Sequence, residues 1–503
     1  MPVSLRKSWS NFGITTPASY SRAANWHDFF VIVAKNGKIT DMTNKKSPHS
    51  DNAKRLSMEE LTSFAKRRGF VFQASEIYGG VGGFWDLGPY GVELANNIKQ
   101  SWWREFVNRN FNVVGLDSTI IQHPKLWEAS GHVDTFVDPM IDCKECKHRF
   151  RADHVAGEDT NDLNKLSEAL ADKSCPHCGK KGAFTEPRQF NMMFKTNVGP
   201  VEDTGSTSYL RPETAGGIFA QYDNVRETTR AKLPFGIAQI GKAFRNEITP
   251  GDFIFRLREL TQMELEVFVK PDEAPRWYEF WKQYCMDWVQ SIGLKADHLR
   301  FHDHADDERA HYAAASVDIQ FEYPFGFKEL YGIANRTDYD LAAHTKVSGK
   351  DLSFFDEETK QRYIPYVIEP SVGVERLLMA VMLDAYDEES VEGDTRVVLR
   401  FKPEIAPIKV AVLPLSKKPE LSELSRDVFK EIAGDWRVEY DETQSIGRRY
   451  RRQDEIGTPF CVTVDFDSLE DKAVTVRDRD TMQQERIQIT ELKNYLDQKL
   501  ALS

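Results

Sequence analysis

Charged side chains recur at almost every second position in one segment of the chain, FRNEITPGDFIFRLRELTQMELEVF, residues 244–268. The polar positions of its second half are Arg256, Arg258, Gln262, Glu264 and Glu266. Residues two apart share a strand face, so the pattern predicts a charged face opposite an apolar one. Arginines fixed in one cleft would bind the phosphates of ATP while a carboxylic acid is activated. A solvated sheet face with cross-strand ion pairs is the alternative.

Two C-x-x-C pairs form a second chemical pattern. Cys143 pairs with Cys146 and Cys175 with Cys178, and four thiolates at such spacing fit a tetrahedral, structural zinc site. His148 and His177 are reserve ligands. Two unconnected reduced pairs are the alternative.

A third pattern is the run Gly447-Arg448-Arg449-Tyr450-Arg451-Arg452. Four arginines around one aromatic residue can hold phosphates and stack a base, which suggests local RNA contact. A solvated charge run is the alternative.

The elements that position these residues can be predicted from periodicity. Ser57 with Glu60 forms a capping box for a short helix that stops at Gly69, and apolar residues four apart predict a helix over Val92–Asn108. The charged segment predicts a long hairpin, with strands Ile237–Glu247 and Ile254–Phe268 joined by the turn TPGD. Further predicted elements are strands Val113–Ile121 and Tyr366–Ile368 and helices 162–173, Trp277–Ile292 and Gly373–Leu383.

Three regions are expected along the chain. Residues 1–56 form an N-terminal extension, residues 57–402 a catalytic domain interrupted by a zinc-binding insertion at 140–187, and residues 403–503 a smaller domain. In the last region, strands 408–413, 436–440 and 460–465 with a helix at 421–433 predict a βαβ-type α/β arrangement.

Composition sets outer bounds. The chain has 503 residues, 41% of them hydrophobic, which suffices for a large core and a second domain. Its net charge of −12 argues against a global attraction to nucleic acid, so any RNA contact must be local. No long apolar run and no secretory signal pattern occur, so we expect a cytoplasmic protein without a membrane partner.

The charged segment resembles motif 2 of the class II aminoacyl-tRNA synthetases, and its FRNE and TQMELE ends look like the glycyl-tRNA synthetases. The segment EPSVGVER, residues 369–376, resembles motif 3. SEIYGGVGGFWDLGPYG, RPETAGGIF and ELYGIANRTDYDL are also similar to the glycyl family. Signatures of class I synthetases and a Walker A glycine loop are absent from the sequence.

The resemblance implies an α+β fold, with a class II antiparallel sheet flanked by helices, a zinc-binding insertion and a C-terminal α/β anticodon-binding domain. It implies ATP-dependent attachment of glycine to tRNA(Gly) through a glycyl-adenylate. ATP, Mg²⁺ and structural Zn²⁺ would be the cofactors. The partners would be tRNA(Gly), glycine and a second copy of the chain in a homodimer.

By residue, the resemblance implies that Arg245 and Arg376 are catalytic, with Glu247 on the adenine side and Glu329 near ATP and Mg²⁺. The implied ATP-binding set is Arg245, Asn246, Glu247, Phe255, Arg256, Leu257, Arg258, Glu259, Leu260, Glu329, Leu330, Gly373, Val374, Glu375 and Arg376. The implied glycine-binding set is Arg151, Glu213, Leu260, Thr261, Gln262, Met263, Glu264, Glu369, Pro370, Ser371, Val372 and Gly373. Selectivity would rest on Glu213, Glu264 and Ser371, because two carboxylates can pair with the ammonium group while the serine closes the space of a Cβ.

Three positions depart from the family pattern: Leu260 stands in place of a phenylalanine that stacks on adenine, Gly216 in place of a glutamine, and Glu375 adds a carboxylate beside Arg376. Two alternative functions stay open. One is a synthetase-like accessory or RNA-binding subunit, and the other is a different class II enzyme, such as the prolyl or threonyl type. Glycine-dependent ATP–pyrophosphate exchange would separate the three.

Overall fold

The structure is a computed structural model, and it describes residues 55–158, 160–200, 205–305, 313–391, 393–434 and 436–501. The predicted extension, residues 1–56, lies almost entirely outside the described residues. None of the helices in the described ranges combines the length and apolar composition that a membrane span requires.

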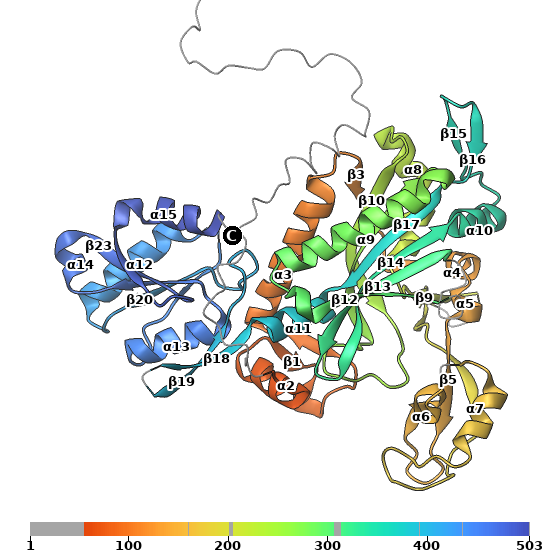
Figure 1. Cartoon of the computed structure of the whole chain (residues 1–503), viewed down its shortest axis with the longest axis horizontal. Helices are drawn as coiled ribbons and strands as arrows, with labels where there is room; N and C mark the ends of the chain where they lie inside the picture. Colours follow the sequence, from red (N-terminus) through yellow and green to blue (C-terminus); the bar gives the residue numbers. More distant parts are fainter. Residues whose placement is uncertain are drawn as a thin grey trace, which may run out of the picture. The chain divides into compact units, whose positions relative to one another are not determined.

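A seven-stranded sheet forms the centre of the larger domain (Figure 1). Its strand order is β12-β13-β14-β17-β11-β10-β3, and all neighbours are antiparallel except β10 and β3. The strands are β3 (Val113–Gly115), β10 (Phe235–Phe244), β11 (Glu259–Val269), β12 (Leu299–Asp303), β13 (Ala315–Tyr323), β14 (Gly326–Thr337) and β17 (Tyr366–Gly373). The predicted antiparallel sheet is confirmed.

Helices pack on this sheet through apolar faces. They are α3 (Pro89–Trp103), α8 (Ala215–Thr229), α9 (Ala274–Ser291), α10 (Tyr339–Ser348) and α11 (Val374–Ala385). The predicted stripe on α3 is confirmed, because Leu94, Ile98, Trp102 and Phe106 are fully buried. This helix begins at Pro89, earlier than expected, and ends in a π-helical turn over Arg104–Asn108. The capping box of α2 (Met58–Arg67) is also confirmed, since Ser57 and Glu60 bond each other's backbone N–H.

The predicted hairpin is correct in its pairing but wrong in its length. Strand β10 ends at Phe244 and β11 starts only at Glu259, with Phe244 opposite Glu259. Residues 252–255 form a turn, in which Asp252 and Phe253 have φ values of 55° and 60°; Arg256 pairs with Gly251, and the Arg258 N–H donates to the Gly83 carbonyl. The arginines predicted on the second strand therefore lie in a loop.

Two other strand predictions need correction. The segment Val113–Ile121 divides into β3 and β4 (Ile121–Gln122), which belong to different sheets. Between them, Arg211 donates to the Ser118 carbonyl, so a side chain replaces strand pairing. Strand β17 runs five residues past Ile368, through Pro370 to Gly373, and its pairing with β11 has a gap opposite Pro370. Proline has no N–H to donate there.

A smaller module carries the cysteines (Figure 1, β5, α6 and α7). It contains β5 (Val137–Asp142), β6 (Arg149–Arg151), β7 (Arg188–Asn191), α6 (Ala152–Ala156) and α7 (Leu163–Leu170). Its core is its own, made by Ile141, Ala152, Leu166, Phe184 and neighbours. The remaining short elements of this half are β1 (Val71–Gln73), β2 (Trp85–Leu87), α4 (Pro124–Ala129), α5 (His132–Thr135), β8 (Lys195–Asn197), β9 (Thr207–Leu210), β15 (Phe354–Asp356) and β16 (Gln361–Tyr363).

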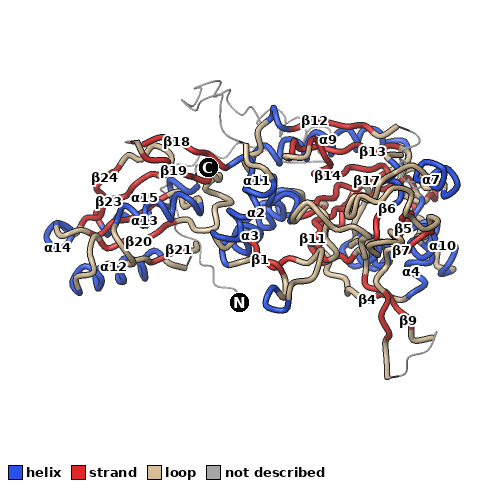
Figure 2. Tube along the Cα trace, turned by 90° about the horizontal axis from the view of Figure 1, so that it is seen from below, coloured by secondary structure: helices blue, strands red, loops and turns tan. Residues whose placement is uncertain are grey.

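The C-terminal domain is α/β, as predicted. Its sheet has the order β21-β20-β22-β23-β24, with parallel pairs on both sides of β20. Figure 2 shows these strands among helices α12, α13 and α15. The elements are β20 (Val410–Pro414), α12 (Pro419–Ile432), β21 (Val438–Tyr440), α13 (Ile446–Ile456), β22 (Phe460–Val464), α14 (Asp467–Asp471), β23 (Ala473–Asp478), β24 (Gln484–Gln488) and α15 (Ile489–Ala501). Before it, the hairpin β18 (Tyr386–Val391) and β19 (Asp394–Leu399) follows α11 directly.

Candidate active site and cysteine cluster

A pocket opens where the 245–258 loop meets strands β11, β14 and β17. Its lining residues are Arg245, Glu247, Ile254, Phe255, Arg256, Leu257, Leu260, Gln262, Glu329, Ser371, Gly373, Glu375 and Arg376. All except Ile254 were expected from the sequence. The fold therefore brings residues from the motif 2 and motif 3 segments, far apart in the chain, into one space.

Arg376 lies in the first turn of α11 and is held in place from two sides. Its Nη1 is 2.9 Å from Glu329 Oε2, and its Nε donates to the Phe255 carbonyl at 3.0 Å. The guanidinium carbon lies 4.3 Å from the centre of the Phe255 ring. The Arg376 guanidinium lowers the pKa of Glu329, so both groups stay charged at neutral pH.

Arg245 follows the end of β10, and only one nitrogen of its guanidinium donates a hydrogen bond to the described residues. Its Nε donates to the Pro212 carbonyl at 3.1 Å. Among the residues that the structure describes, none accepts a hydrogen bond from its two Nη groups. Those donors can therefore serve an anionic ligand in the pocket.

Arg258 has a different environment. Its Nε and Nη2 donate to the Glu247 carbonyl at 3.0 and 2.7 Å, and its Nη1 donates to the Gly82 carbonyl at 2.8 Å. Three bonds to backbone oxygens fix the loop on which Glu247 and Arg256 lie. Arg258 thus supports the shape of the pocket wall.

Glu264 is the most heavily hydrogen-bonded carboxylate of the region. Its Oε2 accepts from the backbone N–H groups of Thr214 and Ala215, at 2.8 and 2.9 Å, and from the Thr214 hydroxyl. Its Oε1 accepts from Gln262 and Ser371, at 2.7 and 2.8 Å. The carboxylate lies at the N-terminus of α8, where a negative charge is stabilised.

Glu213 is buried, with its side-chain Oε2 at 3.5 Å from His132 Nε2 and its Oε1 at 3.9 Å from Arg336 Nη2. Burial opposes its ionisation, but His132 and Arg336 lower the pKa of Glu213 to about 2. The group is therefore a carboxylate at neutral pH.

Arg336 links two more buried acids. It donates to both oxygens of Glu369, at 2.9 and 3.0 Å, and to both oxygens of Asp340, at 2.8 and 2.9 Å. Burial nevertheless raises the pKa of Glu369 to about 8. The sequence reasoning did not single out Arg336, His132 or Thr214. Arg336 and Thr214 lie in the quoted segments ELYGIANRTDYDL and RPETAGGIF, which were the available signals, whereas His132 lies in neither.

The remaining predicted residues lie around this pocket or away from it. Thr261 donates twice to Glu375 at 2.9 Å, which explains the extra carboxylate as a link between β11 and α11. Glu259 pairs with Lys242 at 3.3 Å, and the Asn246 N–H donates to the Met192 carbonyl. Met263, Leu330, Pro370, Val372 and Val374 are buried. Arg151 lies in the cysteine module, 2.7 Å from Asp138 and 2.6 Å from Asp153, and does not line the pocket.

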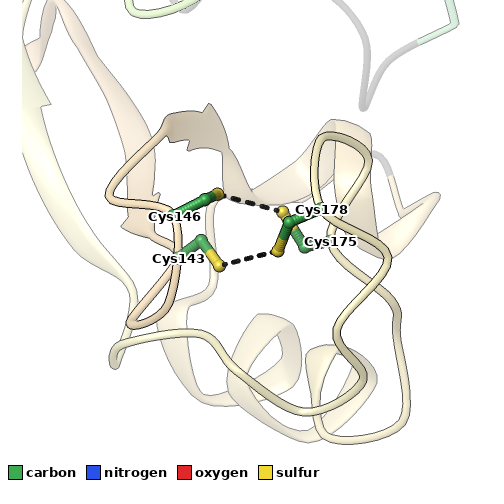
Figure 3. A group of neighbouring side chains, drawn as sticks. All are labelled: Cys143, Cys146, Cys175 and Cys178. Atoms are coloured by element: carbon green, nitrogen blue, oxygen red, sulfur yellow. Dashed lines mark hydrogen bonds between the residues drawn. The ribbon is translucent and has the colours of Figure 1, made fainter.

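The four cysteines meet in one cluster (Figure 3). Cys143 Sγ lies 3.7 Å from Cys178 Sγ, and Cys146 Sγ lies 3.7 Å from Cys175 Sγ. Four sulfurs around one tetrahedral ion at bonds of about 2.3 Å would be about 3.8 Å apart. The cluster thus fits a metal ion, and the alternative of two unconnected pairs is wrong. His148 and His177 stack on each other at 3.5 Å beside it.

The arginine run of the C-terminal domain lies on α13, and fewer of its arginines are available for RNA contact than the sequence indicated. Arg449 is only 1% exposed and donates to the carbonyls of Pro414 and Asp441. Arg452 contacts the Asp441 carboxylate. Arg448 is exposed.

Comparison with known proteins places these features in a class. Residues 142–386 match the core domain of class II tRNA synthetases of the G, H, P, S and T group, and residues 409–499 match an anticodon-binding domain. The larger domain and the pocket are thus those of a class II tRNA synthetase.

Curated relatives make the assignment specific. The chain is 54% identical over 465 residues to the glycine–tRNA ligase of Geobacillus thermodenitrificans, which covers 90% of this chain and 99% of the relative. It is 54% identical to the enzyme of Caldanaerobacter subterraneus subsp. tengcongensis and 53% identical to that of Thermobifida fusca, each covering 89% of this chain and 99% of the relative. The chain belongs to the glycine–tRNA ligase family and attaches glycine to tRNA.

Proposed function

We propose that the pocket binds ATP and glycine side by side and joins them as glycyl-adenylate. In this step a glycine carboxylate oxygen attacks the α-phosphorus, the bond to the bridging oxygen breaks, and pyrophosphate leaves. A terminal hydroxyl of tRNA(Gly) then attacks the glycyl carbonyl carbon and AMP leaves. The observation that carries the proposal is the meeting of Arg245, Arg376 and Ser371 in one pocket.

Within this reaction, Arg245 and Arg376 neutralise negative charge that grows on the phosphates. Donors already fixed in place stabilise such charge without reorganisation. Arg376 is fixed by Glu329 and Phe255, and Arg245 by Pro212. Glu247 lies on the side of the pocket that receives adenine, and Leu260 contacts the base without stacking on it.

Mg²⁺ would neutralise phosphate charge beside Glu329 when bound, because it binds carboxylate oxygen and phosphates together. Glu329 is ionised and lines the pocket, which fits that role.

Glycine would occupy the end of the pocket near Ser371 and Gln262. Its ammonium group would donate to Glu213, whose Oε1 accepts no hydrogen bond from the described residues. Glu264 already accepts hydrogen bonds from five donors, one of which is the Ser371 hydroxyl, and so keeps Ser371 in place. The link from Glu264 to Ser371 leaves the serine positioned to exclude a Cβ.

Further proposals concern the rest of the molecule. The cysteine cluster would hold zinc, since four thiolates without an open position suit a structural ion. The boundary at residues 402 and 403 is supported by the two family matches, because the first ends at residue 386 and the second begins at residue 409. The homodimer, the cytoplasmic location and Arg151 as a glycine-binding residue stay predictions drawn from the sequence.

The test is glycine-dependent ATP–pyrophosphate exchange with Arg245→Ala and Arg376→Ala. Each variant should lose on the order of 10²-fold or more in kcat, the typical effect of removing one such donor. Arg362→Ala in β16, where the arginine side chain is 59% exposed, is the matched control and should keep full activity. Unchanged exchange in either pocket variant would overturn the proposal.

A further inference from the structure

One oxygen of Glu213 is left without a hydrogen-bond donor although it is buried. Glu213 Oε2 is close to His132, but Oε1 accepts no hydrogen bond from the described part of the chain, and Arg336 is 3.9 Å away. A buried anionic oxygen without a donor is costly. Its position therefore suits a ligand that brings its own N–H groups.

His132 lies beside the other oxygen, with Nε2 at 3.5 Å from Oε2. It opens α5 directly after Gly131, whose φ of 82° turns the chain out of α4. The ring lies edge-on to Trp127 and Phe136, with centres 5.5 and 5.4 Å away. Its Nδ1 is 2.8 Å from Ser130 Oγ, so both the plane and the tilt of the imidazole are set.

A chain of contacts leads from His132 to Arg245, the arginine proposed to bind phosphate. Phe136, which packs against His132, lies 5.9 Å from the Arg245 guanidinium. Arg245 in turn donates to the carbonyl of Pro212, next to Glu213 in the chain. His132 and Glu213 are thus tied to the arginine beside which the carboxylate of glycine must react.

We propose that His132 is a positioning residue for glycine, which donates from Nε2 to Glu213 Oε2 and so directs Oε1 toward the ammonium group. The inference rests on the proposed role of Glu213. Ser130 Oγ lies 2.8 Å from Nδ1 and holds the ring in the orientation that aims Nε2 at Glu213. His132 itself does not touch the reacting atoms.

The test compares His132→Ala with His132→Gln in the exchange reaction. Alanine removes the donor, whereas the glutamine amide N–H reaches nearly the same place as Nε2–H. His132→Ala should raise KM for glycine roughly 10- to 100-fold, the range for loss of a hydrogen bond to a charged group. KM for ATP should stay within about twofold. His132→Gln should recover most of the glycine KM.

Glu213→Gln and the double variant separate the two levels of the argument. If Glu213→Gln raises the glycine KM and His132→Ala in that background adds little, the positioning role holds. If Glu213→Gln has its effect but His132→Ala leaves the glycine KM unchanged, this inference is wrong and the proposed pocket stands. If Glu213→Gln has no effect, the proposed pocket itself fails. If His132→Ala and His132→Gln raise the KM values for glycine and ATP alike, the residue is merely structural, and the inference is overturned.

Discussion

At the scale of residues, the site is dominated by an excess of carboxyl groups around one buried arginine, Arg336. They belong to Glu213, Glu264, Glu266, Asp340 and Glu369. Arg336 is helped by His132 and Arg245 beside Glu213 and by Arg211 beside Glu264, and the raised pKa values of Glu266 and Glu369 indicate that protons neutralise part of the rest. In the proposed pocket, the ammonium group of glycine would add a further positive charge.

Glu266 supplies one of the protons. It is fully buried, neither of its oxygens accepts a hydrogen bond from the described residues, and burial together with Glu369 raises its pKa well above the ordinary value. The folded protein therefore binds this proton more tightly than the unfolded chain does. Stability is lost as pH rises above about 4.3, the ordinary glutamate pKa.

Glu266→Gln should remove that loss, because an amide of the same shape carries no proton to release. Relative to the wild type, the free energy of unfolding of the variant should grow between pH 5 and pH 8, as measured by urea denaturation at both values. Glu279→Gln on the exposed face of α9 is the control and should show a constant difference. A constant difference for Glu266→Gln as well would show that the carboxyl is ionised when folded.

The sequence could predict those residues that lie in a recognisable motif. Arg245, Arg376 and Ser371 lie in segments whose charge pattern and resemblance mark them, and they do line one pocket with the predicted neighbours. His132 acts through Glu213, 81 residues away, and lies in no quoted motif; Arg336 lies in a quoted segment, but its partner Glu369 is 33 residues away. A single histidine or arginine in a sequence gives no sign of such a partner.

At the scale of elements, apolar periodicity predicted helices well and strand ends poorly. Alternation continues through Arg256 and Arg258, yet β11 begins at Glu259, because residues 252–255 form a turn, Arg256 pairs with Gly251, and the Arg258 N–H donates to the Gly83 carbonyl. The strand predicted over Tyr366–Ile368 continues to Gly373, and the neighbouring strand β14 pairs with it even at Pro370. The ends of β11 and β17 depend on backbone geometry and on the neighbouring strands, which the alternation of polar and apolar residues does not reveal.

The cysteine module provides the prediction at this scale. We expect about one zinc per chain, and Cys175→Ser should lower the zinc content together with thermal stability or tRNA charging, because metal binding and folding of such modules are coupled. Cys461→Ala, in the C-terminal sheet and outside the cluster, should keep the metal. Metal analysis of the purified proteins checks both. A wild-type protein without zinc that is insensitive to chelation would contradict the assignment.

At the scale of the whole molecule, the proposed glycine pocket is assembled by the sheet and not by any one segment. Glu213 precedes α8, Glu264 lies on β11 and Ser371 on β17, and the pairing of Glu264 with Ser371 across the two strands joins them. Class II core and anticodon-binding domain together account for the attachment of glycine to tRNA. If these residues bind glycine as proposed, selectivity would depend on how the central strands align.

The most direct measurement is exchange over separate titrations of glycine and alanine with Ser371→Ala and Glu264→Gln. Ser371→Ala removes one donor to Glu264 and the bulk of a hydroxyl, so we predict a rise in KM for glycine of roughly tenfold, measurable activation of alanine, or both. Glu264→Gln should raise the glycine KM at least as much, since five donors face its carboxylate. If the glycine KM stays within about twofold in both variants and alanine is still rejected, glycine binds elsewhere.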